Sequence, residues 1–318
     1  MNCIRRWVGG VCKESAAFRR RLRNRLHLVK TLLIWIVLPL LAVMALAACA
    51  PLRALNVLTN SGGGHILSAD VPYGPLARQR LDVYTPTSAA PAGGWPMVVF
   101  FYGGSWNTGE RSEYGFVASS LAAHGVLTLV ADYRLYPEVR YPEFLNDSAL
   151  ALAFGLTQGA RLGANPKRIF VMGHSAGAYN AAMLALDPRW LAATGHAPDE
   201  LAGWIGLAGP YDFFPTDNLQ AQPVFFHPNY PAGAQPIEYG NQRAPRTFLG
   251  APIGDTLVSP TRSTQNLAAR LQAAGTPVTL KMYERPSHAT LIGAFGWPLQ
   301  WIAPVRADVL DFIAGVLV

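Results

Sequence analysis

Short, unbroken apolar runs recur along the chain and alternate with segments of helical periodicity. Such runs are typical of strands buried on both faces of a sheet. They predict strands over residues 97–102, 125–131, 168–172, 201–207 and 278–283, and two short strand-like runs precede them at residues 66–71 and 78–84. Helices are predicted over residues 114–124, 144–160, 176–186, 261–274 and 304–318. Strands separated by helices indicate βαβ crossovers, so we expect one α/β domain with a mostly parallel central sheet and helices on both faces.

Residues 210–245 do not follow this alternation. The segment is rich in proline, phenylalanine and asparagine and has no regular period. Loops of this length in a compact domain are commonly functional lids or disordered segments. We therefore expect an excursion of the chain over the sheet.

The N-terminus has a different pattern, in which a basic segment precedes an apolar one. Residues 1–30 contain nine Lys or Arg and one acidic residue, and residues 31–48 are uncharged. This order is typical of a secretion signal or a membrane helix. The apolar run ends in Leu46-Ala47-Ala48-Cys49, which resembles the lipobox of bacterial lipoproteins, where cleavage precedes a cysteine that then carries lipid.

Two interpretations of this leader remain open. In the first, residues 1–48 are a signal peptide and Cys49 is the lipid-attachment site of a mature chain, 49–318, that contains no other cysteine. In the second, the apolar segment stays as an uncleaved anchor helix and Cys49 is a buried thiol. Both predict a membrane-anchored protein of the bacterial cell envelope with its α/β domain, residues 49–318, outside the cytoplasm.

Charge and composition exclude several classes of protein. The chain is 51% hydrophobic, which excludes disorder over most of its length. The net charge of +7 comes from the leader, because the rest has 17 basic and 18 acidic residues. A nucleic-acid-binding face needs clustered cations, so nucleic acid is not an expected partner. No Cys/His metal spacing, phosphate loop or dinucleotide fingerprint is present in the sequence, so we expect no metal and no cofactor.

A nucleophile motif lies between a predicted strand and the next predicted helix. The residues Gly173-His174-Ser175-Ala176-Gly177 match the pattern G-x-S-x-G in the strand–turn–helix context of a nucleophile elbow. The two glycines leave room for the strand and the helix to pack closely. The turn raises the serine hydroxyl above the carboxyl edge of the sheet, beside a helix N-terminus that favours a developing anion. Ser175 is the predicted nucleophile.

A nucleophilic serine needs a base, and the base needs an orienting acid. Of the seven histidines, His288 alone follows the last predicted strand, at the functional edge of the sheet. Asp255 lies in the loop before the helix predicted over 261–274 and is the expected acid. The order Ser175, Asp255, His288 is that of α/β-hydrolases. Asp212, which follows an earlier strand, is a rival for the acid, and Asp255 could instead only cap a turn or helix.

Further upstream, Tyr102-Gly103-Gly104-Ser105-Trp106 ends a buried strand, and Asp132-Tyr133-Arg134-Leu135 ends the next one. Together with the elbow and the acid loop Gly254–Pro260, these motifs resemble carboxylesterases of the hormone-sensitive-lipase and kynurenine-formamidase-like group. The resemblance covers residues 82–318. It implies the α/β-hydrolase fold and an oxyanion hole formed by the amides of Gly103, Gly104 and Ala176.

The chain departs from this family in one motif, because Tyr102 stands where the family has histidine. Backbone amides stabilise the oxyanion, so the hole is expected to survive this change. What it puts in doubt is the hydrogen bond behind the hole. We expect Asp132 and Arg134 to form a structural pair beneath the site, and Asp147 to cap a helix or join a salt bridge. Trp106 is expected to pack or to line the pocket.

These observations predict a serine hydrolase that cleaves small-molecule carboxylic esters through an acyl-enzyme. An amide hydrolase, either arylformamidase-like or a peptidase, is the alternative on the same fold. A surface lipoprotein that binds without catalysis is the alternative from another class. The complete Ser, Asp and His set argues against it.

Overall fold

The structure of the protein is a computed structural model, which describes residues 23–25, 27, 29–41, 51–59 and 63–315. The chain divides into two compact units, Met1–Ala54 and Leu55–Val318. We describe each unit by itself.

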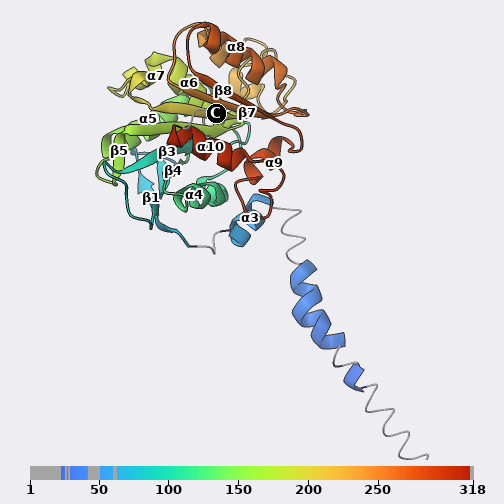
Figure 1. Ribbon diagram of the computed structural model, residues 1–318. Coiled ribbons are helices and arrows are strands. Elements are labelled where there is room, and N and C mark those ends of the chain that lie inside the picture. The colour runs from blue at the N-terminus through green and yellow to red at the C-terminus, as the bar shows by residue number, and fades with distance from the viewer. Residues whose placement is uncertain (1–22, 26, 28, 42–50, 60–62, 316–318) are drawn as a thin grey trace, which may run out of the picture. The chain divides into compact units, whose positions relative to one another are not determined.

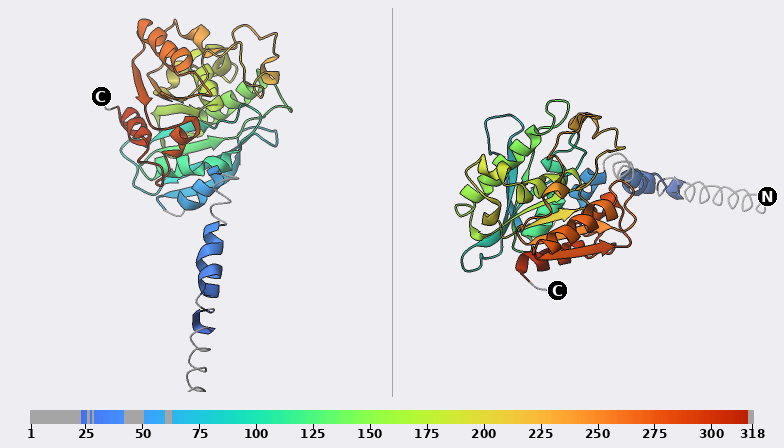
Figure 2. Two further views of the ribbon diagram at one scale, coloured as in Figure 1. Left: turned by 90° about the vertical axis from the view of Figure 1, so that its right-hand side faces the viewer. Right: turned by 90° about the horizontal axis from the view of Figure 1, so that it is seen from above.

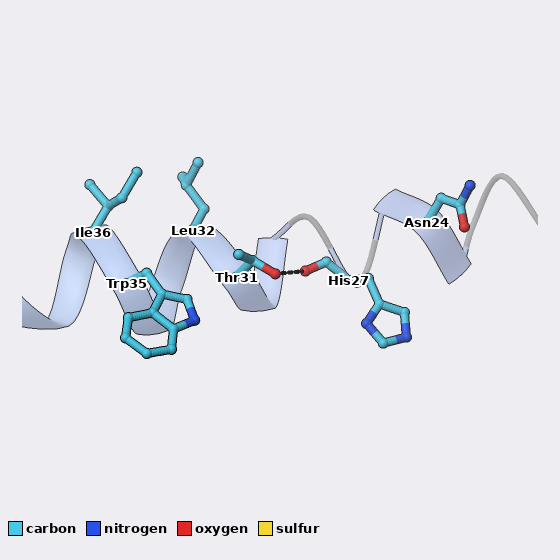
Figure 3. A pocket seen from close by; sticks show the side chains of 6 residues that line it. All are labelled: Asn24, His27, Thr31, Leu32, Trp35 and Ile36. Carbon is cyan, nitrogen blue, oxygen red and sulfur yellow. Dashed lines mark hydrogen bonds between the residues drawn. The ribbon is translucent and has the colours of Figure 1, made fainter.

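The N-terminal unit contains one helix, Arg23–Leu41, that by length and composition could cross a membrane, among the residues described. Its side chains are mostly exposed, and Thr31 donates a hydrogen bond to the carbonyl oxygen of His27, 2.8 Å away. Figure 3 shows that the six residues lining a hollow here all belong to this helical segment. Cys49, the expected lipid-attachment site, lies outside the described residues.

The second unit is built around an eight-stranded sheet with the order β1-β2-β4-β3-β5-β6-β7-β8. The strands are β1 (His65–Pro72), β2 (Arg80–Pro86), β3 (Trp95–Phe101), β4 (Leu127–Ala131), β5 (Ala164–His174), β6 (Gly203–Leu207), β7 (Thr247–Pro252) and β8 (Val278–Tyr283). β2 runs antiparallel to β1 and β4, and the other neighbours are parallel. The central strands β4, β6 and β7 are buried along their whole length, which explains their continuous apolar sequences.

Helices cover both faces of this sheet. They are α3 (Pro51–Thr59), α4 (Gly115–Ala122), α5 (Glu143–Gln158), α6 (Ala176–Leu186), α7 (Pro188–Ala192), α8 (Asn266–Ala273), α9 (His288–Gly293) and α10 (Val305–Ala314). Single helical turns of this unit lie at Arg111–Tyr114, Pro198–Glu200, Pro223–Phe225, Pro236–Tyr239 and Thr261–Gln265, and the turn Leu33–Val37 belongs to the helix of the N-terminal unit. Figures 1 and 2 show the sheet between two helical layers, with α4 and α10 on one side and α5, α6 and α8 on the other.

This architecture confirms the predicted α/β fold, in which the sheet is mostly parallel. Strand β7 was not predicted, because its six buried residues, Thr-Phe-Leu-Gly-Ala-Pro, have the small residues and terminal proline of a loop. Three short helices, α3, α7 and α9, were not predicted either. Among them, α7 begins where the Asp187 side chain accepts a hydrogen bond from the backbone N–H of Arg189, a local N-cap that periodicity does not detect.

Candidate active site

The Ser175 turn connects β5 to α6 at the carboxyl edge of the sheet. Ser175 has a backbone φ of 54°, in the left-handed region that non-glycine residues seldom adopt. Its N–H donates to the carbonyl oxygen of Leu207 in the neighbouring strand β6, 2.9 Å away. A side chain at Gly173 would overlap the backbone of Gly177, and a side chain at Gly177 would overlap that of Phe101. The two glycines therefore permit the close strand–helix packing that holds the strained serine.

The three residues expected to carry the chemistry lie in one chain of hydrogen bonds. His288, at the start of α9, has its Nε2 atom 2.8 Å from Ser175 Oγ. Its Nδ1 atom is 2.7 Å from Asp255 Oδ2. The side chain of Asp255 is fully buried, and that of His288 is nearly so. The spacing meets the hydrogen-bond requirement for proton transfer between a nucleophile and a base.

Asp255 occupies the loop that follows β7. Burial tends to raise the pKa of its carboxyl group, but the hydrogen bond with His288 and the N–H groups of Leu257 and Val258 outweigh burial and lower the pKa below its usual value. Those two N–H groups lie 2.9 and 3.1 Å from Oδ1. Asp255 is therefore a carboxylate at neutral pH, with one oxygen held by the loop and the other facing His288.

The rival acid, Asp212, is engaged elsewhere. Its Oδ1 atom is 2.9 Å from Arg262 Nη2, and Arg262 also donates to the carbonyl oxygen of Phe214. Asp212 lines the cavity in front of Ser175. Its position fits a role in the cavity wall, whereas Asp255 is the carboxylate that meets His288.

The loop after β3 lies against the serine. A side chain at Gly103 would come within 2.9 Å of Ser175 Cβ. Burial raises the pKa of the nearby Tyr114 hydroxyl, and the backbone N–H of Gly103 partly offsets this rise, so this amide lies beside the phenol. Gly104 has a φ of +128°. Ser105 and Ala176 both line the cavity beside Ser175.

If the Gly104 amide is an oxyanion-hole donor, as the sequence predicts, replacing Gly104 by valine lowers kcat by about 10²–10³. The added Cβ would overlap the carbonyl of Thr108, and the backbone conformation disfavours any side chain. Steady-state kinetics with a soluble ester, beside the thermal unfolding midpoint, tests this. The control is Gly254→Ala, where the added Cβ meets no atom within 4 Å. A parental rate in Gly104→Val contradicts the expectation.

Tyr102, which replaces the family's histidine, anchors this loop from behind. Its hydroxyl donates to Asp132 Oδ1 at 2.7 Å and accepts from Arg78 at 3.0 Å. The Tyr133 hydroxyl donates to the Tyr102 carbonyl oxygen at 2.7 Å. Asp132 also binds the side chain of Arg111. The tyrosine thus supplies the hydrogen bond behind the loop that the substitution had put in doubt.

The prediction that Asp132 and Arg134 form a pair with each other is wrong. Asp132 follows β4 directly, and its side chain faces Tyr102 and Arg111. The side chain of Arg134 instead faces helix α5. There the Arg134 Nε atom is 2.8 Å from Asp147 Oδ2, and the Asp147 side chain is fully buried. Asp147 is therefore a salt-bridge partner, one of the two roles expected for it.

A cavity of about 570 Å³ opens in front of Ser175 and His288. The first part of the 210–245 excursion forms one wall through Asp212, Phe213, Pro215, Thr216, Asp217, Asn218, Gln220 and Ala221. Trp106 lines the cavity as expected, and its indole N–H donates to Asn180 at 2.9 Å. Among the described residues, no group of three or more His, Cys, Asp or Glu is arranged to hold a metal ion.

The site contains a second histidine, His174, that was not predicted from the sequence. His174 is buried, its ring centroid lies 5.1 Å from that of His288, and its Nε2 atom is 3.0 Å from the His288 carbonyl oxygen. A carbonyl only accepts, so Nε2 carries the proton. Burial, reinforced by the nearby His288, lowers the pKa of His174 to about 3. A neutral imidazole thus holds the backbone of the expected base. Its adjacency to Ser175 was the available signal.

This depressed pKa predicts a pH-dependent stability. In the unfolded chain His174 titrates near 6.5. Between about pH 6.5 and 3 the unfolded state binds the extra proton, so His174 makes the fold less stable as the pH falls, by up to about 1.4 kcal/mol per pH unit. We expect His174→Gln to flatten this slope. Urea unfolding of both proteins from pH 7 to 4 measures it, and parallel stability curves contradict it.

Comparison with known proteins places the chain in a family. The BD-FAE family model matches residues 81–271. Isoprenylcysteine alpha-carbonyl methylesterase ICME of Arabidopsis thaliana is 29% identical over 148 residues, which cover 45% of this chain and 34% of that protein. Kynurenine formamidase of Danio rerio is 30% identical over 146 residues, 46% of this chain and 47% of that protein. Esterase LipC of Mycobacterium tuberculosis is 29% identical over 225 residues, 64% and 54% of the two chains. The chain thus spans about a third to a half of the length of these relatives.

Solved structures agree on the fold. Esterase 2 of Thermogutta terrifontis, phosphoramylated by tabun, has a TM-score of 0.64 and 19% identity, covering 80% of this chain and 95% of that one. Esterase B of Lactobacillus rhamnosis, inhibited by a phosphonate, has a TM-score of 0.71 and 18% identity, covering 87% and 94%. The sheet order, the elbow and the family match lead to one conclusion: the chain belongs to the BD-FAE family of esterase-type proteins with the α/β-hydrolase fold.

Proposed function

We propose that the protein is a serine hydrolase that cleaves carboxylic esters of small molecules. The observation that carries the proposal is the chain of hydrogen bonds from Ser175 through His288 to Asp255, with distances of 2.8 and 2.7 Å. Ser175 and His288 border a cavity that is large enough for a small ligand. Relatives named as esterases and a methylesterase support ester chemistry.

In the proposed mechanism, His288 Nε2 takes the proton from Ser175 Oγ as the oxygen attacks the ester carbonyl carbon. The amides of Gly104 and Ala176 hold the oxyanion, and the Gly103 amide supports the loop after β3 through its contact with the Tyr114 phenol. The carbon–oxygen bond to the alcohol then breaks, and His288 returns the proton to the leaving oxygen. Water, deprotonated by His288, releases the acid from the acyl-enzyme by the same route. Asp255 keeps Nδ1 protonated throughout, so that Nε2 can accept.

Labelling with a fluorophosphonate tests this proposal. The full chain is expected to react at one serine, and mass spectrometry of the peptide should find the label on Ser175. No labelling is expected in Ser175→Ala. A folded protein that neither takes the label nor cleaves short p-nitrophenyl esters would instead support a binding protein without catalysis.

An amide hydrolase on the same site is the second candidate, favoured by the similarity to a kynurenine formamidase. The leaving group separates the two reactions, because an amine needs more complete protonation before it departs than an alcohol does. The purified protein is compared on p-nitrophenyl esters and on N-formyl anilides. A larger kcat/KM for the anilide than for the ester would indicate that amide hydrolysis, and not ester hydrolysis, is the natural reaction.

We further propose that residues 1–48 are a lipoprotein signal and that Cys49 carries the lipid, which leaves a catalytic domain of residues 49–318. Stable anchoring takes more than one acyl chain, and a diacylglyceryl cysteine provides two. Cys49→Ser is expected to abolish processing and lipid attachment without loss of esterase activity. Intact mass of the membrane-extracted protein measures this. A mass that retains residues 1–48 in both proteins would favour the uncleaved anchor helix.

A further inference from the structure

Two segments of the catalytic domain that are distant in sequence expose large apolar side chains. Val57 and Leu58 in α3 are 69% and 44% exposed, and Trp297 and Trp301, after α9, are 64% and 72% exposed. The two segments are in contact, because the Trp297 indole N–H donates to the Leu58 carbonyl oxygen at 3.1 Å. We call these four residues the indole patch. Exposed apolar clusters of this kind mark interaction surfaces.

Buried contacts hold α3, the helix that carries Val57 and Leu58 of the indole patch, against the rest of the domain. Asn56 is buried, its amide donates to the Ser112 carbonyl oxygen, and its side-chain oxygen accepts from the Phe116 N–H, both at 2.7 Å. On the same side of α3, Leu55 is buried and packs so closely on Gly296 that an added Cβ there would overlap it. These contacts fix the rotation of α3, which leaves Val57 and Leu58 on its outer face.

The chemistry of the indole patch matches the interface of a lipid bilayer. Residues 54–59 and 293–303 contain no charged side chain. Indole rings favour the boundary between headgroups and acyl chains because they combine a large apolar surface with one polar N–H. Both indole N–H groups already bond to backbone carbonyls, since Trp301 donates to Pro298 at 3.1 Å. Entry into the interface would therefore leave neither N–H unsatisfied.

The chain also brings this surface close to a membrane attachment. Nine residues, 42–50, separate the apolar helix Arg23–Leu41 from α3, so their connection spans at most about 35 Å. A lipid on Cys49 would be nearer still, eight residues before Val57. Either form of the leader confines the indole patch near the bilayer, where its effective concentration at the lipid surface is high.

We propose that the indole patch is a second membrane contact, through which the catalytic domain docks on the bilayer interface. The occupant is the headgroup–acyl boundary of the lipid, entered by Trp297, Trp301 and Val57. Because the patch is uncharged, docking depends on apolar burial and not on anionic lipid. This inference does not depend on the esterase proposal.

Quenching of tryptophan fluorescence by brominated lipid tests the proposal in the full chain. The protein is reconstituted in phosphatidylcholine vesicles with and without brominated acyl chains, alongside a Trp297→Phe/Trp301→Phe double variant. Subtracting the variant's fluorescence isolates the two indoles from the other six tryptophans. We expect this difference signal to fall at least twofold in brominated vesicles, and equally at low and high salt.

A charge in the indole patch provides the matched comparison. Val57→Glu retains both indoles but is expected to remove at least half of the bromine quenching. Leu150→Glu introduces the same charge at a 38% exposed leucine on α5, which Figure 1 shows well away from α3, and should leave the quenching unchanged. The thermal unfolding midpoint in detergent, measured on each variant, is expected to stay near the parental value and shows that the fold is intact.

Two outcomes would overturn the proposal. In the first, the difference signal is the same in brominated and unbrominated vesicles, which would mean that the indoles stay in water. In the second, the indoles are shielded from the aqueous quencher acrylamide but not reached by bromine, and the protein sediments as a dimer. The surface would then be covered by a second copy of the chain.

Discussion

Replacing Ser175 by alanine is expected to lower kcat by about 10⁶, with residual turnover from the oxyanion hole and substrate binding. The variant keeps the backbone of the elbow, because alanine tolerates a φ of 54° about as well as serine does. Its free energy of unfolding should therefore stay near the parental value. Single-turnover and steady-state kinetics on a p-nitrophenyl ester, with a urea unfolding curve, provide the measurement.

Ser105→Ala is the matched control for this experiment. Ser105 also lines the cavity, and its φ of 49° is close to that of Ser175. Its hydroxyl accepts a hydrogen bond from Asn218 at 3.2 Å and does not meet His288. Removing it is expected to change kcat less than tenfold. Equal losses in the two variants would mean that the cavity needs hydroxyl groups in general, and Ser175 would lose its proposed role as nucleophile.

The parts of the site that the sequence predicts are those tied to the order of the strands. Ser175 is identified by two glycines flanking a turn, and His288 by its place after the last strand. Parallel strands end at one edge of the sheet, so residues 113 positions apart come within 2.8 Å. To predict that Ser175 and His288 lie close together, only the order of the strands and helices is needed, and the apolar runs indicate that order.

Other features depend on contacts that no local pattern encodes. The position of His174 next to Ser175 does not show that its ring turns to the carbonyl of His288. Asp132 and Arg134 are close in sequence, but each pairs with a residue from another element. The excursion 210–245 has no period, so its place in the cavity wall comes from tertiary packing alone.

Asp255→Asn is expected to lower kcat by about 10⁴, because the amide favours the wrong histidine tautomer. An asparagine at this position can donate from its side-chain nitrogen to His288 Nδ1. The imidazole then carries its proton on Nε2, which can no longer accept the proton of Ser175. The substitution is isosteric and keeps an oxygen for the N–H groups of Leu257 and Val258, so the fold should survive. The kcat and the rate of fluorophosphonate labelling are expected to fall together.

Asp212→Asn is the control that distinguishes the loss of the orienting acid Asp255 from a general loss of negative charge near the cavity. Asp212 binds Arg262, whose side chain is 43% exposed, and exposed ion pairs contribute only about 0–1 kcal/mol. We therefore expect KM to change while kcat stays within about tenfold of the parent. A kcat that collapses in Asp212→Asn but persists in Asp255→Asn would transfer the role of the orienting acid to Asp212. Such a result would require His288 to turn away from a buried carboxylate 2.7 Å distant, and a crystal structure of the variant would reveal that rotation.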